Sequence, residues 1–395
     1  MTAGRPDGRT APAVKVTARG AERWKQGHPW IYRSDVAEEP DQTPGIVPVS
    51  DRKGKFLGKA LYSPASEIRL RLLTRTDEPI DATWWTKRIG DAAERRAGIT
   101  ASAWRAVHAE GDGLPSLIID KYGPYIVAQL LSAGLEMQRA DVIAAIREVF
   151  TPDGILLRND AGVRRHEGLP EEVVLAHGDV PKTVEVSEDG LRYLAAPWTG
   201  QKTGAFLDQR ENRALVGQHT KAGGRALDLF TYHGSFALHL ARNAKQVIAV
   251  DQSAEALARG VENARLNGIG NIEWREANAF DLLRELEQRR EQFDTIVLDP
   301  PAFAKTKANR DRAVAGYKEI NLRALRILAA GGELFTSSCS YHVTRDVFNA
   351  MLADAARDSG RRVQFVAATG AAADHPELLN VPETGYLKGV LLRAL

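Results

Sequence analysis

The sequence of 395 residues has few of the residues that build disulfide frameworks and metal sites. It contains one cysteine, Cys339, and its nine histidines show no metal-ligand spacing. A single thiol excludes an intramolecular disulfide, a multi-cysteine zinc ribbon and a cysteine-ligated iron–sulfur cluster. We therefore expect no disulfide and no bound metal, so chemistry at Cys339 has to be that of a lone thiol.

Long apolar segments are also absent. The longest stretch without a charged residue, 122–135, has 14 residues, which is too short to cross a bilayer. The first residues lack the apolar core of a signal peptide. We therefore expect a cytoplasmic protein without a membrane contact, in which residues 1–12 are a disordered leader.

The net charge of +2 hides an uneven distribution along the chain. Residues 1–100 hold 18 basic and 13 acidic side chains, whereas residues 101–200 hold 9 basic and 15 acidic ones. A basic N-terminal segment is typical of a surface that holds a polyanion, although solvated surfaces of no special function show the same imbalance. Both interpretations stay open on charge alone.

The hydrophobic pattern divides the chain after the leader into three parts. Residues 13–79 form short strands and turns around one brief helix, which predicts a small, partly closed β-barrel. Residues 80–198 mix strands and helices, which indicates a central α+β domain. In residues 199–395, apolar strands alternate with long helices, which predicts a doubly wound, mostly parallel sheet. The expected fold class is therefore α/β, with two smaller domains before a Rossmann-like one.

Acidic residues end two of the expected parallel strands. Asp228 lies near the end of strand 225–230, and Asp251 ends the next strand 23 residues later. A carboxylate at the end of the second strand is where such folds hold a ribose diol, because two hydroxyls can donate to one carboxylate. The loop after Asp228 has only Gly234, whereas a diphosphate needs three glycines for close backbone approach. The pattern argues against NAD and ATP and favours S-adenosylmethionine.

Two further strand ends carry candidate catalytic groups. Asp299 ends the fourth strand, and the following Pro300 and Pro301 form a rigid extended loop that can aim its carboxylate at the amino group of a base. Cys339 ends the neighbouring strand, at the edge where open α/β sheets bind ligands. A lone cysteine is most often a small buried apolar residue, but this position favours a nucleophile.

A thiolate beside Asp299 suits one reaction. Carbon 5 of a pyrimidine is barely nucleophilic, and addition of a thiolate to C6 turns the ring into an enamine whose C5 can attack a sulfonium methyl group. This chemistry needs one cysteine, one methyl donor and a group that binds the N3/N4 edge of the base. The sequence offers Cys339, an S-adenosylmethionine site and Asp299 for these parts.

Five longer motifs resemble one protein family. They are Gly-His-Pro-Trp-Ile-Tyr at 27–32, Gln-Lys-Thr-Gly-Ala-Phe-Leu-Asp-Gln-Arg at 201–210, Gly-Tyr-Lys-Glu-Ile-Asn at 316–321, Ala-Asp-His-Pro at 373–376 and Gly-Tyr-Leu-Lys-Gly at 385–389. Together they are similar to the bacterial 23S rRNA cytosine-C5 methyltransferases, in which a PUA domain and a central α+β domain precede a class I methyltransferase domain. The resemblance covers nearly the whole chain.

The resemblance implies roles for individual residues. Cys339 corresponds to the nucleophile and Asp299 to the partner of the base edge. The residues expected around the cofactor are Gln209, Arg210, Asp228, Phe230, Tyr232, Gly234, Asp251, Asn278 and Asp299. Asn278 stands where relatives often carry Asp against the adenine amino group, and its amide oxygen can accept the same hydrogen bond. Other RNA cytosine methyltransferases expel the product with a second cysteine, which this chain lacks, so another base has to remove the C5 proton.

The resemblance also implies 23S rRNA as the partner and leaves a homodimer open. The target base is expected to flip into the pocket, because attack at C6 needs access to the ring face. Candidate RNA contacts are Lys53, Lys55, Arg69 and Arg71 in the basic N-terminal domain, and Pro300 and Phe303 beside the base. The nearby aromatic residues Trp24, Trp30 and Tyr32 fit a barrel core better than a platform for base stacking.

Two other functions remain as alternatives. In the first, the enzyme methylates an amino group of guanine or adenine in rRNA, Asp299 orients that group, and Cys339 is structural. In the second, the chain is a non-catalytic RNA-binding protein with a degenerate methyltransferase domain. Methyl transfer by a Cys339→Ala variant would favour the first alternative, and failure to bind S-adenosylhomocysteine would favour the second.

Overall fold

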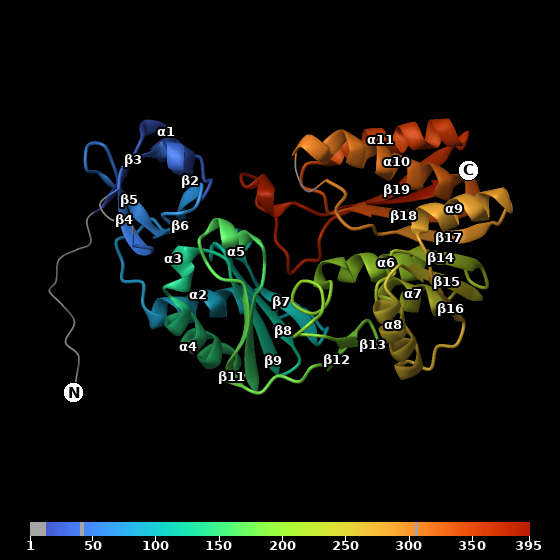
Figure 1. The fold of residues 1–395 in the computed structure, drawn as a ribbon, viewed down its shortest axis with the longest axis horizontal. Coiled ribbons are helices and arrows are strands. Elements are labelled where there is room, and N and C mark those ends of the chain that lie inside the picture. Colours follow the sequence, from blue (N-terminus) through green and yellow to red (C-terminus); the bar gives the residue numbers. More distant parts are fainter. Residues whose placement is uncertain (1–12, 40–42, 305–306) are drawn as a thin grey trace.

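The structure is a computed structural model that describes residues 13–39, 43–304 and 307–395 (Figure 1). The leader expected at residues 1–12 lies outside the described residues. Within the described ranges, no helix combines the length and apolar character needed to cross a membrane. The same ranges contain no group of three or more His, Cys, Asp or Glu side chains arranged to hold a metal ion.

The N-terminal domain is a six-stranded sheet with the order β2-β6-β5-β4-β1-β3. Its elements are β1 (Val14–Val16), α1 (Ala18–Lys25), β2 (Trp30–Tyr32), η1 (Arg33–Asp35), β3 (Val36–Glu38), β4 (Gly45–Asp51), β5 (Phe56–Tyr62) and β6 (Ile68–Thr74). Apolar side chains from α1 and the strands form one core, in which Trp24 packs with Ile31 and Leu70. Trp24 therefore belongs to the core of the domain, as its pattern predicts.

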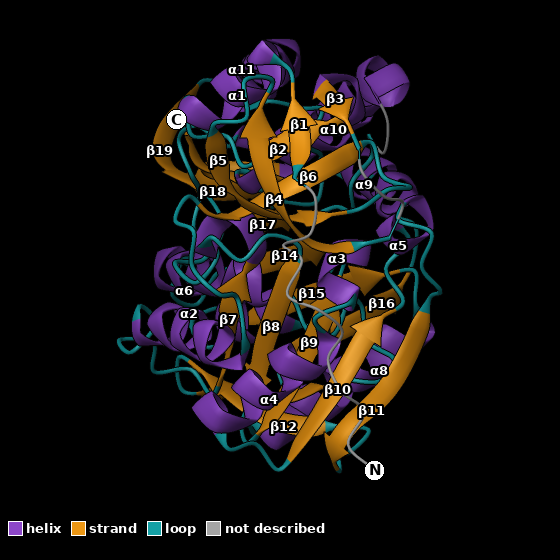
Figure 2. Cartoon of the chain, turned by 90° about the vertical axis from the view of Figure 1, so that its left-hand side faces the viewer, coloured by secondary structure: helices purple, strands orange, loops and turns teal. Residues whose placement is uncertain are grey.

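The central part is a five-stranded sheet with the order β11-β10-β9-β8-β7 (Figure 2). The elements here are α2 (Ala82–Glu94), β7 (Ala103–His108), η2 (Ala109–Asp112), β8 (Leu117–Tyr122), β9 (Tyr125–Leu130), α3 (Ala133–Glu136), α4 (Arg139–Phe150), β10 (Gly154–Asn159), α5 (Val163–His166) and β11 (Glu172–Gly178). Trp85 and Ile89 of α2 pack with Val142 and Ile146 of α4 in the core beside the sheet. Apolar side chains at helical spacing form one face of each helix, and the two faces meet in this core.

A separate hairpin joins the central sheet to the C-terminal sheet. It consists of β12 (Val184–Glu188) and β13 (Leu191–Ala195), which form a two-stranded sheet of their own. Its apolar side chains share a core with Tyr122 of the central sheet and with Leu238 and Ala264 of the C-terminal helices. The hairpin therefore fixes the position of the C-terminal sheet against the central sheet.

The C-terminal part is a seven-stranded sheet with the order β16-β15-β14-β17-β18-β20-β19. Its strands are β14 (Arg225–Leu229), β15 (Gln246–Asp251), β16 (Ile272–Glu276), β17 (Phe293–Leu298), β18 (Leu328–Ser338), β19 (Val363–Thr369) and β20 (Lys388–Ala394). Strands β14 to β18 run parallel, and β20 pairs antiparallel with both β18 and β19. This confirms the predicted doubly wound, mostly parallel sheet and adds an antiparallel edge.

Helices cover both faces of this sheet (Figure 1). They are η3 (Leu207–Gln209), α6 (Arg210–His219), α7 (Ser235–Ala241), α8 (Ala254–Leu266), α9 (Ala279–Gln288), η4 (Lys307–Asn309), α10 (Arg310–Ile327) and α11 (Arg345–Ser359). One core lies between the sheet and α9, α10 and α11, and the other lies on the side of α6 and α7. A parallel sheet needs this double cover, because both of its faces are apolar.

Residues 370–387, which connect β19 to β20, contact all three parts of the chain and include η5 (Pro382–Thr384). Asp374 accepts a hydrogen bond from the backbone N–H of Arg105 in the central sheet at 2.8 Å. Asn380 donates to the carbonyl oxygen of Gln26 after α1 at 3.3 Å. We call this stretch the connecting segment; Figure 1 shows it reaching from the C-terminal sheet toward the N-terminal domain.

The two arginines of β6 correct one prediction from the sequence. Arg69 and Arg71 were expected to contact RNA, but their exposed fractions are 5% and 4%. Arg69 pairs with Glu39 at 2.8 Å, and Arg71 donates to Glu167 of the central part at 2.8 Å. The strand lies between β2 and β5 and is covered on both faces, so period-two alternation does not mark a solvent face here. Neither arginine is available to RNA.

Lys53 and Lys55 lie in the exposed turn between β4 and β5. Their backbone N–H groups donate to Oδ1 of Asp51 at 2.8 and 2.9 Å, which fixes the turn. Both side chains are exposed, so their predicted contact with RNA stays a prediction.

Candidate functional site

A cavity of about 530 Å³ lies at the carboxyl ends of the parallel strands of the C-terminal sheet. This is the edge at which open α/β sheets bind ligands. The predicted site residues that line it are Gln209, Phe230, Tyr232, Asp251, Asn278, Asp299, Pro300, Phe303 and Cys339. Predicted residues as far as 130 positions apart in the sequence, Gln209 and Cys339, therefore meet in one cavity.

The loop between β14 and α7 has an unusual backbone. Phe230, Tyr232 and Gly234 have φ angles of 66°, 52° and 81°, so every second residue is left-handed. A non-glycine residue in this conformation costs about 1 kcal/mol, and such strain concentrates at functional sites. The loop thus adopts at three alternate positions a conformation that usually requires glycine, and it presents two aromatic side chains to the cavity.

Asp251 ties this loop to the end of β15. Its Oδ2 accepts the backbone N–H of Tyr232 at 2.9 Å, and its Oδ1 accepts the backbone N–H of Ser253 at 3.0 Å. Each carboxylate oxygen has a second lone pair, and the side chain is only half-buried. Asp251 can therefore accept the two hydroxyls of a ribose while its position is held by the backbone.

Asn278 begins α9 and caps it. Its Oδ1 accepts the backbone N–H of Phe280 at 2.9 Å and that of Asp281 at 3.3 Å. The sequence predicted that this oxygen accepts a hydrogen bond from an adenine amino group, but the helix cap already uses it. No hydrogen bond from the NH₂ of Asn278 is present among the described residues, and this group suits a ring nitrogen of adenine.

Three predicted cofactor residues do not reach the lining. Asp228 is fully buried and accepts a hydrogen bond from Thr231, and burial raises its pKa to about 7. Gly234 packs against Trp274, which a Cβ atom would meet at 2.4 Å. Arg210 forms an ion pair with Asp374 of the connecting segment at 2.8 Å. These three residues lie behind the residues that line the cavity. The expectation of direct cofactor contact is therefore corrected for each of them.

The charges of the lining fit S-adenosylmethionine better than a nucleotide with a diphosphate. Among the described lining residues, Lys202 and Arg213 are the cations, and each is paired with a carboxylate. The cavity therefore offers no free cation to a diphosphate, whereas its acidic side chains match a positively charged sulfonium. Gln201 and Lys202, which also line the cavity, belong to the motif at 201–210.

Asp299 is held by neutral donors. Its Oδ1 accepts hydrogen bonds from Nε2 of Gln209 at 2.7 Å and from Oγ of Ser337. Gln209 is in turn fixed by Asn212, whose Nδ2 donates to Oε1 of Gln209 at 2.6 Å. Burial raises the pKa of Asp299 to about 6, and the nearby charge of Asp208 adds to this effect. The carboxyl group thus titrates close to neutral pH, as groups with an acid–base role do.

Cys339 follows β18 and is half-buried in the same cavity. Burial and the charge of Asp299 raise the pKa of its thiol, and the ammonium of Lys202 opposes this shift. Lys202 also donates to Asp208, which accepts a further hydrogen bond from Tyr386 of the connecting segment at 2.7 Å. Sequence analysis assigns no individual role to Ser337, Asn212, Lys202 or Asp208, although Lys202 and Asp208 lie in the motif at 201–210 and Asn212 follows it.

Comparison with known proteins identifies the class of this fold and site. The model of a PUA-like domain matches residues 14–75, and the model of S-adenosylmethionine-dependent methyltransferases matches residues 163–393. The second match covers more than half of the chain. The chain is therefore an S-adenosylmethionine-dependent methyltransferase with an N-terminal PUA-like domain, as the fold and the loop after β14 predicted.

Relatives identify the family. The ribosomal RNA large subunit methyltransferase I of Tolumonas auensis is 40% identical over 93% of this chain and 96% of its own length. The protein of the same name from Vibrio cholerae is 40% identical over 97% of this chain and all of its own length. The chain belongs to the family of ribosomal RNA large subunit methyltransferase I. A solved structure assigned as an S-adenosylmethionine-dependent methyltransferase from Streptococcus mutans shares the fold, with a TM-score of 0.82 at 20% identity over 96% of this chain and all of its own.

Proposed function

We propose that this protein transfers a methyl group to C5 of a cytidine in 23S rRNA through a covalent bond between Cys339 and C6 of the base. The names of its relatives support large-subunit rRNA as the substrate. The observation that carries the chemistry is the placement of Cys339 and Asp299 in one cavity. Bound S-adenosylmethionine supplies an electrophilic methyl group, and Asp251, Asn278, Phe230 and Tyr232 are the residues that would hold it.

Asp299 has the right protonation chemistry for cytosine. The N3/N4 edge of cytosine presents one acceptor and one donor, and a protonated carboxyl group presents one donor and one acceptor in return. A pKa raised to about 6 keeps part of Asp299 in that protonated form near neutral pH. The N1/N2 edge of guanine presents two donors and would instead favour an ionised carboxylate, so the protonated form of Asp299 is the one that suits cytosine.

Each bond and proton of the covalent step can be followed. The thiol of Cys339 would first give its proton to solvent, and the thiolate would then form a bond to C6. The electron pair of the C5–C6 double bond moves onto C5, and hydrogen bonding from Asp299 to N3 stabilises the negative charge that spreads over the ring. C5 would take the methyl group from the sulfonium, and S-adenosylhomocysteine would be the leaving group. C5 would then give its proton to water or another base, the electron pair of that C–H bond would re-form the C5–C6 double bond, and the electron pair of the S–C6 bond would return to Cys339 as a thiolate.

The test uses the fact that the chain has one thiol. In 23S rRNA containing 5-fluorocytidine, C5 carries fluorine in place of the proton that has to leave. We expect the enzyme to form a stable RNA adduct that depends on S-adenosylmethionine and maps to the peptide containing Cys339. The matched control is Cys339→Ala, which should form no adduct and no 5-methylcytidine in unsubstituted RNA.

The alternatives give different results in the same assays. Methylation of unsubstituted rRNA by Cys339→Ala, with the methyl group on an amino nitrogen, would replace the covalent mechanism by the N-methyltransferase. Failure of the wild-type chain to bind S-adenosylhomocysteine in calorimetry would leave only an RNA-binding protein with a degenerate domain.

A further inference from the structure

Asp208 belongs to the catalytic cavity, but the function proposed above gives it no role. It lies in η3, lines the same cavity as Asp299 and Cys339, and is 3% exposed. Its Oδ2 accepts hydrogen bonds from Nζ of Lys202 and from the hydroxyl of Tyr386. Its Oδ1 is buried and accepts no hydrogen bond from the residues that the structure describes. Buried polar atoms usually have a partner, so an unpartnered oxygen in a ligand cavity indicates a ligand group that donates to it.

The carboxylate of Asp208 is ionised and held in place. Burial raises the pKa of this group, but the ammonium of Lys202 and the hydrogen bonds from Lys202 and Tyr386 outweigh burial and hold the pKa well below its usual range. The backbone carbonyl oxygen of Asp208 accepts the N–H of Ala372 at 2.8 Å. Both the side chain and the backbone of Asp208 therefore contact the connecting segment.

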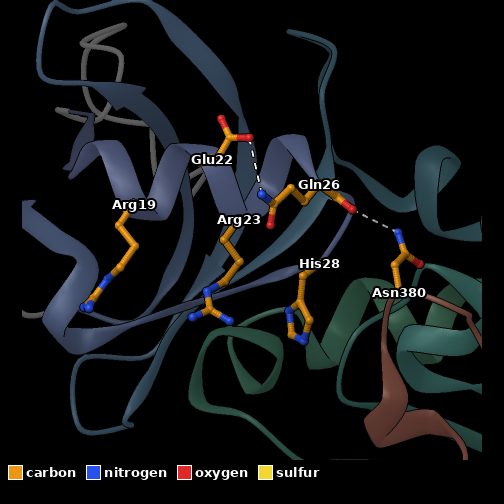
Figure 3. A pocket seen from close by; sticks show the side chains of 6 residues that line it. All are labelled: Arg19, Glu22, Arg23, Gln26, His28 and Asn380. Carbon is orange, nitrogen blue, oxygen red and sulfur yellow. Dashed lines mark hydrogen bonds between the residues drawn. The ribbon is translucent and has the colours of Figure 1, made fainter.

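The connecting segment is itself fixed between these two contacts. Asn380, which lies between Ala372 and Tyr386 in the sequence, donates to the carbonyl oxygen of Gln26 at 3.3 Å, and Figure 3 shows this contact beside α1. The segment is thus held by the N-terminal domain as well as by Asp208. A group that donates to Oδ1 of Asp208 meets a preorganised acceptor, which favours recognition of one ligand geometry.

Asp208 lies beside the groups that the proposed reaction uses. Gln209, the next residue, donates from Nε2 to Oδ1 of Asp299 at 2.7 Å. Burial raises the pKa of Asp299 and that of the Cys339 thiol, and the charge of Asp208 raises both further. The common cavity and the contact through Gln209 place Asp208 next to the carboxyl group that would bind the base edge.

We propose that Oδ1 of Asp208 accepts a hydrogen bond from the exocyclic amino group of the target cytosine and thereby selects cytidine over uridine. The inference rests on the proposed function, in which Asp299 binds the N3/N4 edge of the same base. The amino group at N4 has two hydrogens, so Asp299 can accept one of them and Asp208 the other. Uracil has a carbonyl oxygen at this position. An ionised carboxylate repels that oxygen and is left without a donor, so the contact rejects uracil.

The test replaces the acceptor with a donor. In Asp208→Asn, we expect the amide oxygen to occupy the place of Oδ2, because Lys202 and Tyr386 both donate there, so that the NH₂ group occupies the place of Oδ1. This group can donate to O4 of uracil. Methyl transfer is measured on rRNA fragments that carry cytidine or uridine at the position that the wild-type enzyme methylates. The ratio of kcat/KM for cytidine to that for uridine should fall about 100-fold in the variant.

The ratio is measured at pH 8, because Asp208→Asn also removes a charge that raises the pKa of Asp299. With a pKa of about 6 in the wild type, Asp299 is mostly ionised at pH 8 in both enzymes. A lower pKa of Asp299 therefore does not change the ratio at this pH. A change in the reactivity of Cys339 acts on both RNAs and cancels in the ratio.

Tyr386→Phe is the matched control, because it removes a hydrogen bond to Oδ2 of Asp208 and leaves Oδ1 as it is. Its ratio should stay within about threefold of the wild-type ratio. The double variant Asp208→Asn with Lys202→Met removes the ammonium that the single variant leaves unpaired, and it should show the same fall in the ratio. Calorimetry with S-adenosylhomocysteine shows that each variant keeps a folded cofactor site.

Two results would overturn the role of Asp208. The first is an unchanged ratio in the Asp208→Asn variants, and the second is a fall of equal size in Tyr386→Phe. An unchanged ratio together with weaker binding of S-adenosylhomocysteine would make Asp208 a cofactor ligand instead. If the wild-type enzyme methylates no cytidine in 23S rRNA, the proposed function fails. If it does, and the ratio in Asp208→Asn equals that of the wild type, only the role of Asp208 fails.

Discussion

A buried carboxyl group at the boundary between two domains has a cation as its partner, whereas one in the catalytic cavity has only neutral hydrogen-bond donors among the described residues. Where the N-terminal domain meets the central part, Arg71 forms a bond of 2.8 Å with Glu167, and the charge of Arg71 lowers the pKa of that carboxyl against the opposing effect of burial. In the catalytic cavity, Asp299 accepts hydrogen bonds from neutral groups, and its pKa rises to about 6. Among the described residues, no cation forms an ion pair with Asp299.

A buried ion pair suits a structural role, whereas a buried carboxyl group without a cation suits a role in acid–base chemistry. A buried ion pair fixes both partners in their charged forms, so neither can exchange a proton near neutral pH. A buried carboxyl group without a cation costs stability but titrates where an enzyme can use it. We therefore expect substitutions at the two places to affect opposite properties of the protein.

The largest effect is expected for Asp299→Ala. Loss of the group that binds the base edge should lower kcat/KM for rRNA about 1,000-fold, the scale of removing a positioned transition-state partner. The folded protein holds a proton on Asp299 between pH 3.8 and about 6, where the unfolded chain does not, so this group destabilises the fold as pH rises through that range. The thermal midpoint of the variant at pH 8 should therefore not fall below that of the wild type.

The single thiol provides a control for this variant. Because the charge of Asp299 raises the pKa of Cys339, its removal should lower the pH at which iodoacetamide alkylates the protein. An Asp299→Ala variant with full methyltransferase activity, or with an unchanged alkylation profile, would contradict the role given to this carboxyl group.

Arg71→Met should lower the stability of the protein and leave its KM for rRNA unchanged. It leaves Glu167, which is 3% exposed, without its cation, and loss of one partner of a buried pair costs about 3 kcal/mol of unfolding free energy. The loss should be greater at pH 7 than at pH 4, because protonation of Glu167 removes the unpaired charge. Denaturant unfolding measures this loss of stability, and KM for rRNA should be unchanged under conditions where the variant is folded.

The matched control is the double variant Arg71→Met with Glu167→Gln, which should recover stability. A stable Arg71→Met variant with weakened RNA binding would restore the original prediction for β6.

Asp299 and Arg71 also show where sequence analysis succeeded and where it failed. Asp299 and Cys339 could be placed together because strand order and the common edge of a parallel sheet follow from the alternation of strands and helices. Arg71 could not be placed, because alternation along β6 distinguishes two faces of a strand but does not reveal that the central part covers the outer one. Contacts between domains leave no periodic signal in the chain.

Other parts of the site depended on contacts that cross long distances in the sequence. The antiparallel edge formed by β19 and β20, and with it the connecting segment, was not predicted because its strands do not continue the alternation. Asn212 in α6 donates a hydrogen bond to Gln209, and Ser337 in β18 donates one to Asp299. Sequence analysis did not find these roles, because each residue is an ordinary polar residue within a helix or a strand. The resemblance at 201–210 marked the segment around Gln209 but gave its role as cofactor binding, whereas the structure places its amide against Asp299.

Gln209→Leu should have the smallest effect and distinguishes these two roles. Its amide N–H lowers the pKa of Asp299, so the variant should raise that pKa above about 6. In the proposed reaction, the active enzyme carries one proton on the pair, with Asp299 protonated and Cys339 as a thiolate. As the pH falls through the pKa of Asp299, the pair gains a second proton, Cys339 becomes a thiol, and the enzyme is inactive. The acid limb of the kcat/KM profile, which reports the free enzyme, should therefore move up by about half a pH unit. Gln218→Leu, an exposed change in α6, should leave the profile unchanged, and a fall in S-adenosylhomocysteine affinity without a shifted limb would instead make Gln209 a cofactor ligand.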